Sequence, residues 1–208
     1  MPLLESWAGR AAHTWPYRWL ATEPGELLGA EREERLNETF PVGGFAVRDA
    51  SDRLEGKRYR SASRTLVDGD EVVDLDLPEP WRELVADLMA SSYRETVAGL
   101  LGQEVAEALE LRLVRHGPGD WLGPHTDRDD KVFSHILYFN EGWRQEWGGC
   151  LEILERDDPD AVAARVVPRL GASAMLAQAP DSWHQVTKVR DGEERTRCSL
   201  LVHGMRSA

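Results

Sequence analysis

Two residues that can bind a metal ion, His125 and Asp127, stand two positions apart in the segment GPHTDRDDKVFSHILYFNEGW (123–143). In an extended chain, side chains at positions i and i+2 point to the same side, so the imidazole and the carboxylate can converge on one point. Taken alone, an HxD pattern is common by chance, and its simplest alternative is a turn aspartate beside a surface histidine. A second histidine from another strand would complete a metal site, and His184 in the segment DSWHQV is the candidate.

Two histidines and one carboxylate would occupy one face of an octahedral metal ion and leave the other three positions open, which is the ligand arrangement of non-haem Fe(II) oxygenase sites. The order of the residues that follow His125 strengthens this interpretation. An apolar run ends in Tyr138, a glycine pair follows at 148–149, and an arginine comes on the predicted strand after His184. The hypothesis requires a fold that brings these segments together.

The segments that carry these residues are predicted to be short strands. Leu109, Leu111 and Leu113 alternate with polar residues in ALELRLVRH, which is the period of a half-buried strand. Further runs rich in β-forming residues are separated by Gly, Pro and Asp turns. These runs are KVFSHILYF (131–139), GCLEIL (149–154), ASAMLA (172–177), WHQVTKV (183–189) and RTRCSLLVH (195–203). Strands of this length and spacing predict an antiparallel sandwich or barrel.

Helices are predicted before the strands. From Trp81 to Leu101 the apolar residues follow a 3.6-residue period, with Pro80 at the start and Gly102 at the end. A charged surface helix is expected over 23–40, opened by Pro24 and stopped by Pro41. We therefore expect one domain over residues 1–208, in which 1–102 supply helical support and lid elements and 103–204 form the β core.

The net charge, the lack of long apolar runs and the cysteine content limit the binding partners and the cellular location that we expect. A net charge of −12 would repel a phosphate backbone, so nucleic acid is not expected as a partner. No run of about 18 apolar residues occurs and no basic, apolar leader opens the sequence, so neither membrane insertion nor export is expected. The two cysteines, Cys150 and Cys198, cannot form a disulfide framework. The expected location is the cytoplasm.

From about Leu109 to Val202 the chain resembles the prolyl-4-hydroxylase-like branch of the Fe(II)/2-oxoglutarate-dependent oxygenases. The resemblance is carried, in order, by HGPGDWLGPHTD, ILYFN, WGGCLEIL, WHQV and RCS. It implies an α+β fold with a double-stranded β-helix core, of the jelly-roll or cupin-like type, backed by the N-terminal helices. The related nucleic-acid demethylases carry a second arginine six residues after the first. This chain has His203 at that position after Arg197, so the demethylase branch is not expected.

The resemblance also implies roles for particular residues. His125, Asp127 and His184 would be the iron ligands. The distal carboxylate of 2-oxoglutarate needs a cation, and a guanidinium suits it because it is always charged and can bind both oxygens. Arg197 stands two residues before a serine, Ser199, as the family pattern requires, whereas Arg195 lies nearer the usual separation from the distal histidine. We favour Arg197, because hairpin loops absorb insertions more easily than strand registers do.

Two further residues are candidates for the same ligand. Tyr138 occupies the position of the family's tyrosine and would donate its hydroxyl to the same carboxylate; its alternative is a core tyrosine. His116 stands where many relatives have a tyrosine, and it is either a donor to 2-oxoglutarate or a loop histidine without a role. His135 alternates away from Tyr138 along its strand, so it is predicted to be packed or on the surface. His203 has no motif context.

Other residues have two interpretations each. Trp121, Trp143 and Trp147 flank the motifs and would line a pocket or belong to the core. The basic segment KRYRSASRTL (57–66) would bind a carboxylate or phosphate of the substrate, or form a solvated loop.

The predicted activity is hydroxylation of an unactivated C–H bond with Fe(II), 2-oxoglutarate and O2, with ascorbate as an optional reductant and with release of succinate and CO2. A carboxylate at Asp127 favours hydroxylation over the halogenation of relatives with a small residue there. A small-molecule substrate is favoured, because this compact chain has no obvious protein-docking module. The alternatives are hydroxylation of a prolyl or other residue in a protein or peptide, and a non-catalytic binding module.

Overall fold

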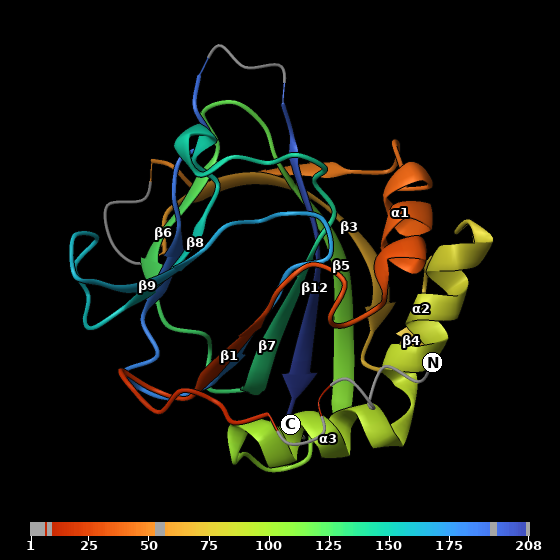
Figure 1. The fold of residues 1–208 in the computed structure, drawn as a ribbon, viewed down its shortest axis with the longest axis horizontal. Coiled ribbons are helices and arrows are strands. Elements are labelled where there is room, and N and C mark those ends of the chain that lie inside the picture. The colour runs from red at the N-terminus through yellow and green to blue at the C-terminus, as the bar shows by residue number, and fades with distance from the viewer. Residues whose placement is uncertain (1–6, 8–9, 53–56, 192–194, 207–208) are drawn as a thin grey trace.

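Strands from both halves of the chain form a single antiparallel sheet that curls into a nearly closed, barrel-like jelly roll. The computed structural model describes residues 7, 10–52, 57–191 and 195–206. Along the sheet the strand order is β1-β10-β7-β12-β5-β3-β6-β11-β8-β9, with β2 and β4 paired to β3. Figure 1 shows the α-helices grouped on one side of the barrel, away from β6, β8 and β9.

Along the described chain the α-helices all come before β5, and the later elements are almost entirely strands. The helices are α1 (Ala30–Glu38), α2 (Glu79–Met89) and α3 (Ser91–Leu101), with a 3₁₀ helix at Gln145–Trp147. The strands are β1 (Trp19–Thr22), β2 (Ala46–Asp49), β3 (Tyr59–Asp68), β4 (Glu71–Val72), β5 (Ala108–His116), β6 (Trp121–His125), β7 (Lys131–Tyr138), β8 (Leu151–Leu154), β9 (Val162–Val166), β10 (Ser173–Ala177), β11 (His184–Val186) and β12 (Arg197–Met205).

The predicted β half is confirmed, and its alternation explains the two environments of the sheet. On β5, Leu109, Leu111 and Leu113 pack against the helices in the larger apolar core. The residues between them, Glu110 and Arg112, face the interior of the barrel. Successive side chains of a strand point to opposite faces, so each long strand contributes to the apolar core with one face and to the barrel interior with the other.

The helical half differs from the prediction in two places. The single helix expected over 81–101 is two helices, because Ala90 between them is extended (φ −63°, ψ 140°). Both keep the predicted stripe and bury it against the sheet. The helix expected over 23–40 begins only at Ala30, since Gly25 and Gly29 adopt positive φ angles of 81° and 80°, outside the helical region.

The strands of the N-terminal half were not predicted from the sequence. β3 lies between β5 and β6 and joins the two sides of the barrel. It pairs with β5 through Ala62 to Val67 and with β6 through Tyr59 and Arg60. Residues before 103 therefore form part of the barrel wall, in addition to the helices that support it. Among the described residues, none of the helices is long and apolar enough to cross a membrane.

Candidate metal and cosubstrate site

A cavity of about 410 Å³ lies inside the barrel. Its lining comes from β3, β5, β6, β7, β11 and β12, so residues far apart in the sequence meet there. The predicted residues His116, His125, Asp127, His184, Arg197 and Ser199 all line it.

The three predicted metal ligands converge at one point of this cavity. His125 ends β6 and His184 begins β11, and the two residues are direct partners in the antiparallel ladder. Their ring centroids lie 4.1 Å apart. With Asp127, their ligand atoms all lie within 4.8 Å of one another. Asp127 stands two residues beyond the end of β6, in a loop, so only His125 belongs to the expected strand.

Hydrogen bonds to the backbone determine which nitrogen of each histidine can bind a metal. Nδ1 of His125 lies 3.0 Å from the carbonyl oxygen of Gly123, and Nδ1 of His184 lies 2.9 Å from that of Ser182. A carbonyl oxygen only accepts, so each Nδ1 carries the proton and each Nε2 keeps a free lone pair. Burial lowers the pKa of both histidines, which favours the neutral form that metals require. The donor set fits Fe(II).

Asp127 is held as a carboxylate by two donors. Its Oδ1 accepts a hydrogen bond of 2.6 Å from Nζ of Lys131, and its Oδ2 accepts one of 2.6 Å from Oγ of Ser134. Burial by itself would raise the pKa of Asp127, but the charge of Lys131 is the largest of the interactions that hold this pKa well below its usual range. The group is therefore ionised, as a metal ligand must be.

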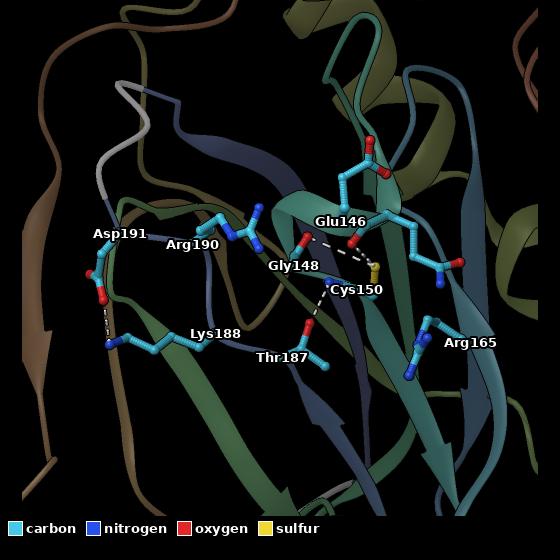
Figure 2. Close-up of a pocket in the computed structure, with 9 residues that line it drawn as sticks. Glu146, Gly148, Cys150, Arg165, Thr187, Lys188, Arg190 and Asp191 are labelled. Atoms are coloured by element: carbon cyan, nitrogen blue, oxygen red, sulfur yellow. Dashed lines mark hydrogen bonds and ion pairs between the residues drawn. The ribbon is translucent and has the colours of Figure 1, made fainter.

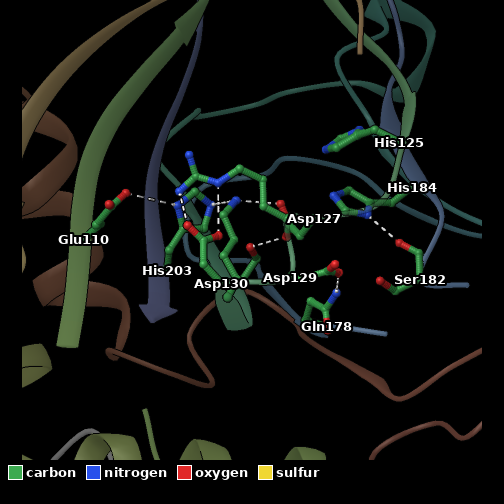
Figure 3. Close-up of polar contacts among 12 residues, drawn as sticks. Glu110, His125, Asp127, Asp129, Asp130, Gln178, Ser182, His184 and His203 are labelled. Carbon is green, nitrogen blue, oxygen red and sulfur yellow. Dashed lines mark hydrogen bonds and ion pairs between the residues drawn. The ribbon is translucent and has the colours of Figure 1, made fainter. Parts of the chain in front are cut away.

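A row of polar groups continues behind Asp127, away from His125 and His184 (Figure 3). Nζ of Lys131 lies 3.0 Å from Nε2 of His203, whose Nδ1 lies 4.0 Å from a carboxylate oxygen of Glu110. An ammonium only donates, so Nε2 of His203 accepts and Nδ1 faces Glu110 with its proton. Burial, followed by the charge of Lys131, lowers the pKa of His203 to about 4.

Four residues of this site were not predicted from the sequence: Glu110, Lys131, Ser134 and His203. A signal for His203 was present, because Arg197, Ser199, Leu201 and His203 alternate along β12 and all line the cavity. Extending the two-residue period from Arg197 to the end of its strand would have placed His203 inside the barrel.

Arg197 lies at another part of the cavity wall and is 2% exposed. Its Nη1 lies 3.3 Å from Oγ of Ser199 and 3.3 Å from Nδ1 of His116, and its guanidinium carbon lies 5.0 Å from the ring centroid of Tyr138. Oη of Tyr138 and Nε of Arg197 are buried without a hydrogen-bond partner among the described residues. Two buried donors side by side suit the two oxygens of a carboxylate, as in 2-oxoglutarate.

His116 is the last residue of β5 and the ladder partner of Arg197, so its interpretation as a loop histidine is wrong. Burial, followed by the charge of Arg197, lowers the pKa of His116 well below its usual value. The neutral ring accepts from Arg197 through Nδ1, which leaves Nε2 as a donor toward the cavity.

Arg195 does not join this group. It precedes β12, is exposed, and places its guanidinium carbon 3.8 Å from the ring centroid of Trp147. Trp143 packs edge to face on Trp147. Trp121, Trp143 and Trp147 are all missing from the cavity lining, so the interpretation that they line the pocket is wrong.

Two other predicted features are placed by the structure. His135 is fully buried, with Nδ1 2.9 Å from Oη of Tyr93, which confirms it as a packed histidine. The basic segment 57–66 divides between two environments: Lys57 lines the cavity, whereas Arg60 is exposed and pairs with Asp120 at 3.2 Å. The interpretation of this segment as a solvated loop is therefore wrong, because most of it is β3.

A second pocket, outside the barrel, has no comparable chemistry (Figure 2). Lys188 there is neutralised by Asp191, at 2.8 Å. Burial raises the pKa of the Cys150 thiol to about 11, so the thiol stays protonated and unreactive at neutral pH.

A family model described as the 2OG-Fe(II) oxygenase superfamily matches residues 111–203, the part of the chain that contains every site residue above from His116 to His203. Over these residues the chain is similar to the 2OG-Fe(II) oxygenase superfamily. This similarity supports the predicted class, a 2-oxoglutarate-dependent dioxygenase, and the predicted use of Fe(II), 2-oxoglutarate and O2. Ascorbate stays a prediction.

Individual relatives agree with this oxygenase family. The chain is 27% identical over 122 residues to the prolyl 3-hydroxylase OGFOD1 of Xenopus laevis, a match that covers 56% of this chain and 24% of that protein. The chain thus spans about a quarter of the length of the curated relative that it matches.

Solved structures show the same fold. A Pseudomonas putida prolyl-4-hydroxylase superposes with a TM-score of 0.64 at 20% identity, covering 99% of this chain and 97% of the other. A Trichoplax adhaerens prolyl hydroxylase, in complex with a hypoxia inducible factor peptide, superposes with a TM-score of 0.66 at 14% identity, covering 98% and 87%. These likenesses confirm the predicted double-stranded β-helix core backed by N-terminal helices.

Proposed function

We propose that this oxygenase hydroxylates a prolyl or another residue of a protein or peptide, with Fe(II) held by His125, Asp127 and His184. The convergence of one ligand atom from each of these three side chains within 4.8 Å is the observation that carries the metal assignment. When bound, Fe(II) together with 2-oxoglutarate and O2 supplies the oxidant for an unactivated C–H bond, and 2-oxoglutarate leaves as succinate and CO2.

The other residues bind and orient 2-oxoglutarate. Arg197 pairs with its distal carboxylate, and Oη of Tyr138 donates to the same group. Ser199 keeps the guanidinium in place through its contact of 3.3 Å with Nη1. His116 contributes a second neutral donor from the facing strand. We prefer Arg197 to Arg195 for this role, because Arg197 is buried at the cavity wall and Arg195 is exposed and stacked on a tryptophan.

The similar proteins support a substrate class different from the one favoured by the sequence. The curated relative is a prolyl 3-hydroxylase, and the Trichoplax protein was solved with a peptide bound. Both support the alternative of the sequence analysis, a residue in a protein or peptide, over the small molecule that it favoured. A small-molecule hydroxylase is the second candidate, because a cavity of about 410 Å³ lies within the usual range for such ligands.

An anaerobic titration with Fe(II) and then 2-oxoglutarate tests the site. We expect the visible absorption band of an iron-chelated keto acid in wild type, its loss in His184→Ala, and an unchanged band in His13→Ala, which alters an exposed histidine far from the motifs. Folded protein that binds Fe(II) without such a band would contradict the proposal.

The substrate is tested in air. Arrays of proline-containing peptides and a panel of small carboxylic and amino acids are compared by succinate release and by the gain of one oxygen atom in the mass of the product. Turnover of small molecules alone would favour the second candidate, and binding of ligands without succinate release would favour a non-catalytic module.

A further inference from the structure

Positive charge is concentrated in the cavity of a chain whose net charge is −12. Around the metal site the lining includes more basic than acidic side chains: Arg48, Lys57, Arg112, Arg128 and Lys131 against Glu110 and Asp127. Since the cavity contains the metal site, this excess acts on whatever substrate enters.

Most of these basic groups are already paired with a carboxylate. Lys131 pairs with Asp127 at 2.6 Å, Arg112 with Glu110 at 2.9 Å, and Arg128 with Asp130 at 2.7 Å. Their charges are therefore compensated within the protein.

Lys57 differs from them. Within the part of the chain that the structure describes, no carboxylate forms an ion pair or hydrogen bond with its ammonium group. Arg48, on the strand next to β3, also lacks a carboxylate among those residues, and its Nε donates to Oγ of Ser63 at 3.2 Å. Neither cation is thus paired directly with a carboxylate among the described residues, and the charge of Asp127 only partly offsets the effect of burial on the pKa of Lys57.

Lys57 is partly buried at the wall of the cavity that contains the metal site. Burial lowers the pKa of Lys57 to about 8. Lys57 lines the same cavity as His116, His125 and His184. A buried charge is costly unless a partner compensates it, so the position favours an anionic ligand.

Bound 2-oxoglutarate does not provide that partner under the proposed function. The charges of Fe(II), Asp127, the 2-oxoglutarate dianion and Arg197 cancel when all are present. Asp127 then balances charge at the iron, so Lys131 and Lys57 both stay positive without a full counterion among the described residues. Negative charge brought by the substrate would balance them.

We infer that Lys57, assisted by Arg48, binds a carboxylate of the substrate close to the carbon that is oxidised. The inference rests on the proposed function and specifies, in addition, that the substrate carries a negative charge. An unmodified peptide carries its negative charge as carboxylates, and the two oxygens of one carboxylate can accept hydrogen bonds from both Lys57 and Arg48. The carboxylate belongs either to an Asp or Glu side chain beside the target residue or to a free C-terminus.

Matched peptides and one charge-matched control test this. In the first set of proline-containing peptides, the C-terminus is an amide and the residue beside the proline is Glu, Gln, Lys or phosphoserine. In the second set, that residue is Gln and the C-terminus is a free carboxylate. Binding to anaerobic protein loaded with Fe(II) and 2-oxoglutarate is measured by fluorescence anisotropy, so that turnover is not needed. The variants are Lys57→Glu and Arg58→Glu, which change the net charge equally at neighbouring positions; Arg58 is exposed and outside the cavity lining.

We expect wild type to bind a carboxylate peptide about tenfold more tightly than its neutral counterpart, the gain from one hydrogen-bonded charge. Tighter binding of the Glu peptide would identify the carboxylate as an acidic side chain beside the target residue. Tighter binding of the peptide with a free C-terminus would identify it as the C-terminal carboxylate. Lys57→Glu should abolish this preference and favour the Lys peptide, whereas Arg58→Glu should keep it. If Lys57→Glu does not fold, Lys57→Met should still abolish the preference.

Three outcomes would overturn the inference: no charge preference in wild type, tightest binding of the phosphoserine peptide, or equal effects of the two variants. Loss of the 2-oxoglutarate absorption band in Lys57→Met would also overturn it, by placing Lys57 in the cosubstrate site. Absence of that band in wild type would instead reject the proposed function, so the two failures are distinguishable.

Discussion

Lys131 donates a hydrogen bond of 2.6 Å to Asp127 four residues earlier in the chain, and both side chains are buried. Burial would raise the pKa of Asp127, and Lys131 contributes most among the charges that lower it. Lys131→Met is therefore expected to raise this pKa, so that protons compete with the metal ion. We predict Fe(II) affinity about 10 to 100 times lower at pH 6, with a smaller loss at pH 8.

Anaerobic Fe(II) titrations at the two pH values measure this effect. Lys188→Met provides the control, because Lys188 forms an exposed ion pair with Asp191 outside the barrel. Equal affinity of Lys131→Met and wild type at pH 6 would show that the ion pair does not control the protonation of Asp127.

Arg197 and Arg195 are two residues apart and differ in exposure, which makes them a matched pair for a test of 2-oxoglutarate binding. Arg197→Leu should weaken 2-oxoglutarate binding by about 30-fold or more, the cost of removing one partner of a buried charge pair. Arg195→Leu should leave it within about twofold, as for a surface charge. The absorption band at increasing 2-oxoglutarate gives both affinities, and a larger effect of Arg195→Leu would reverse the assignment.

Tyr138→Phe separates ligand binding from stability. Oη of Tyr138 is buried without a partner among the described residues, so its removal should not lower the free energy of unfolding of the metal-free protein. It should weaken 2-oxoglutarate binding about tenfold, since hydrogen bonds to charged groups contribute about 1.5–3 kcal/mol. Urea denaturation and the 2-oxoglutarate titration measure the two effects. A loss of stability with unchanged binding would identify Tyr138 as a core tyrosine only.

The buried imidazole of His135 should make the free energy of unfolding depend on pH. Burial lowers the pKa of His135 to about 3, whereas in the unfolded chain it keeps its usual value of 6.5. Between these values only the unfolded chain takes up the proton, so the contribution to stability is complete above pH 6.5 and decreases as the pH falls toward 3. At pH 5 the loss from this residue is about 2 kcal/mol.

Urea denaturation of the metal-free protein at pH 7, 6 and 5 measures this dependence. His135→Phe should lose less stability between pH 7 and pH 5 than wild type does. Tyr93→Phe removes the same hydrogen bond but keeps the imidazole, so it should be less stable at every pH and retain the wild-type dependence. Identical pH dependence of His135→Phe and wild type would contradict the prediction.

Local patterns predicted much of the β half and part of the site. The two-residue period placed Leu109, Leu111 and Leu113 in the core and His135 away from the cavity, because strand alternation depends only on neighbouring residues. The helical stripe was also predicted correctly, but the break at Ala90 was not, since an alanine there has no local reason to be extended. β3 was missed because its strand pairing with β5 and β6 is formed by residues distant in the sequence.

The sequence by itself determined which residue types can bind Fe(II) and 2-oxoglutarate, through HxD, the distal His184 and the spacing of Arg197 and Ser199. Only the tertiary structure decided which atoms face the metal, that Arg197 is enclosed while Arg195 is exposed, and that Lys131, His203 and Lys57 share the cavity. The physical reason is that burial and the distances between charges arise when distant strands close the barrel, and these quantities set the protonation and the free ligand atoms of each group.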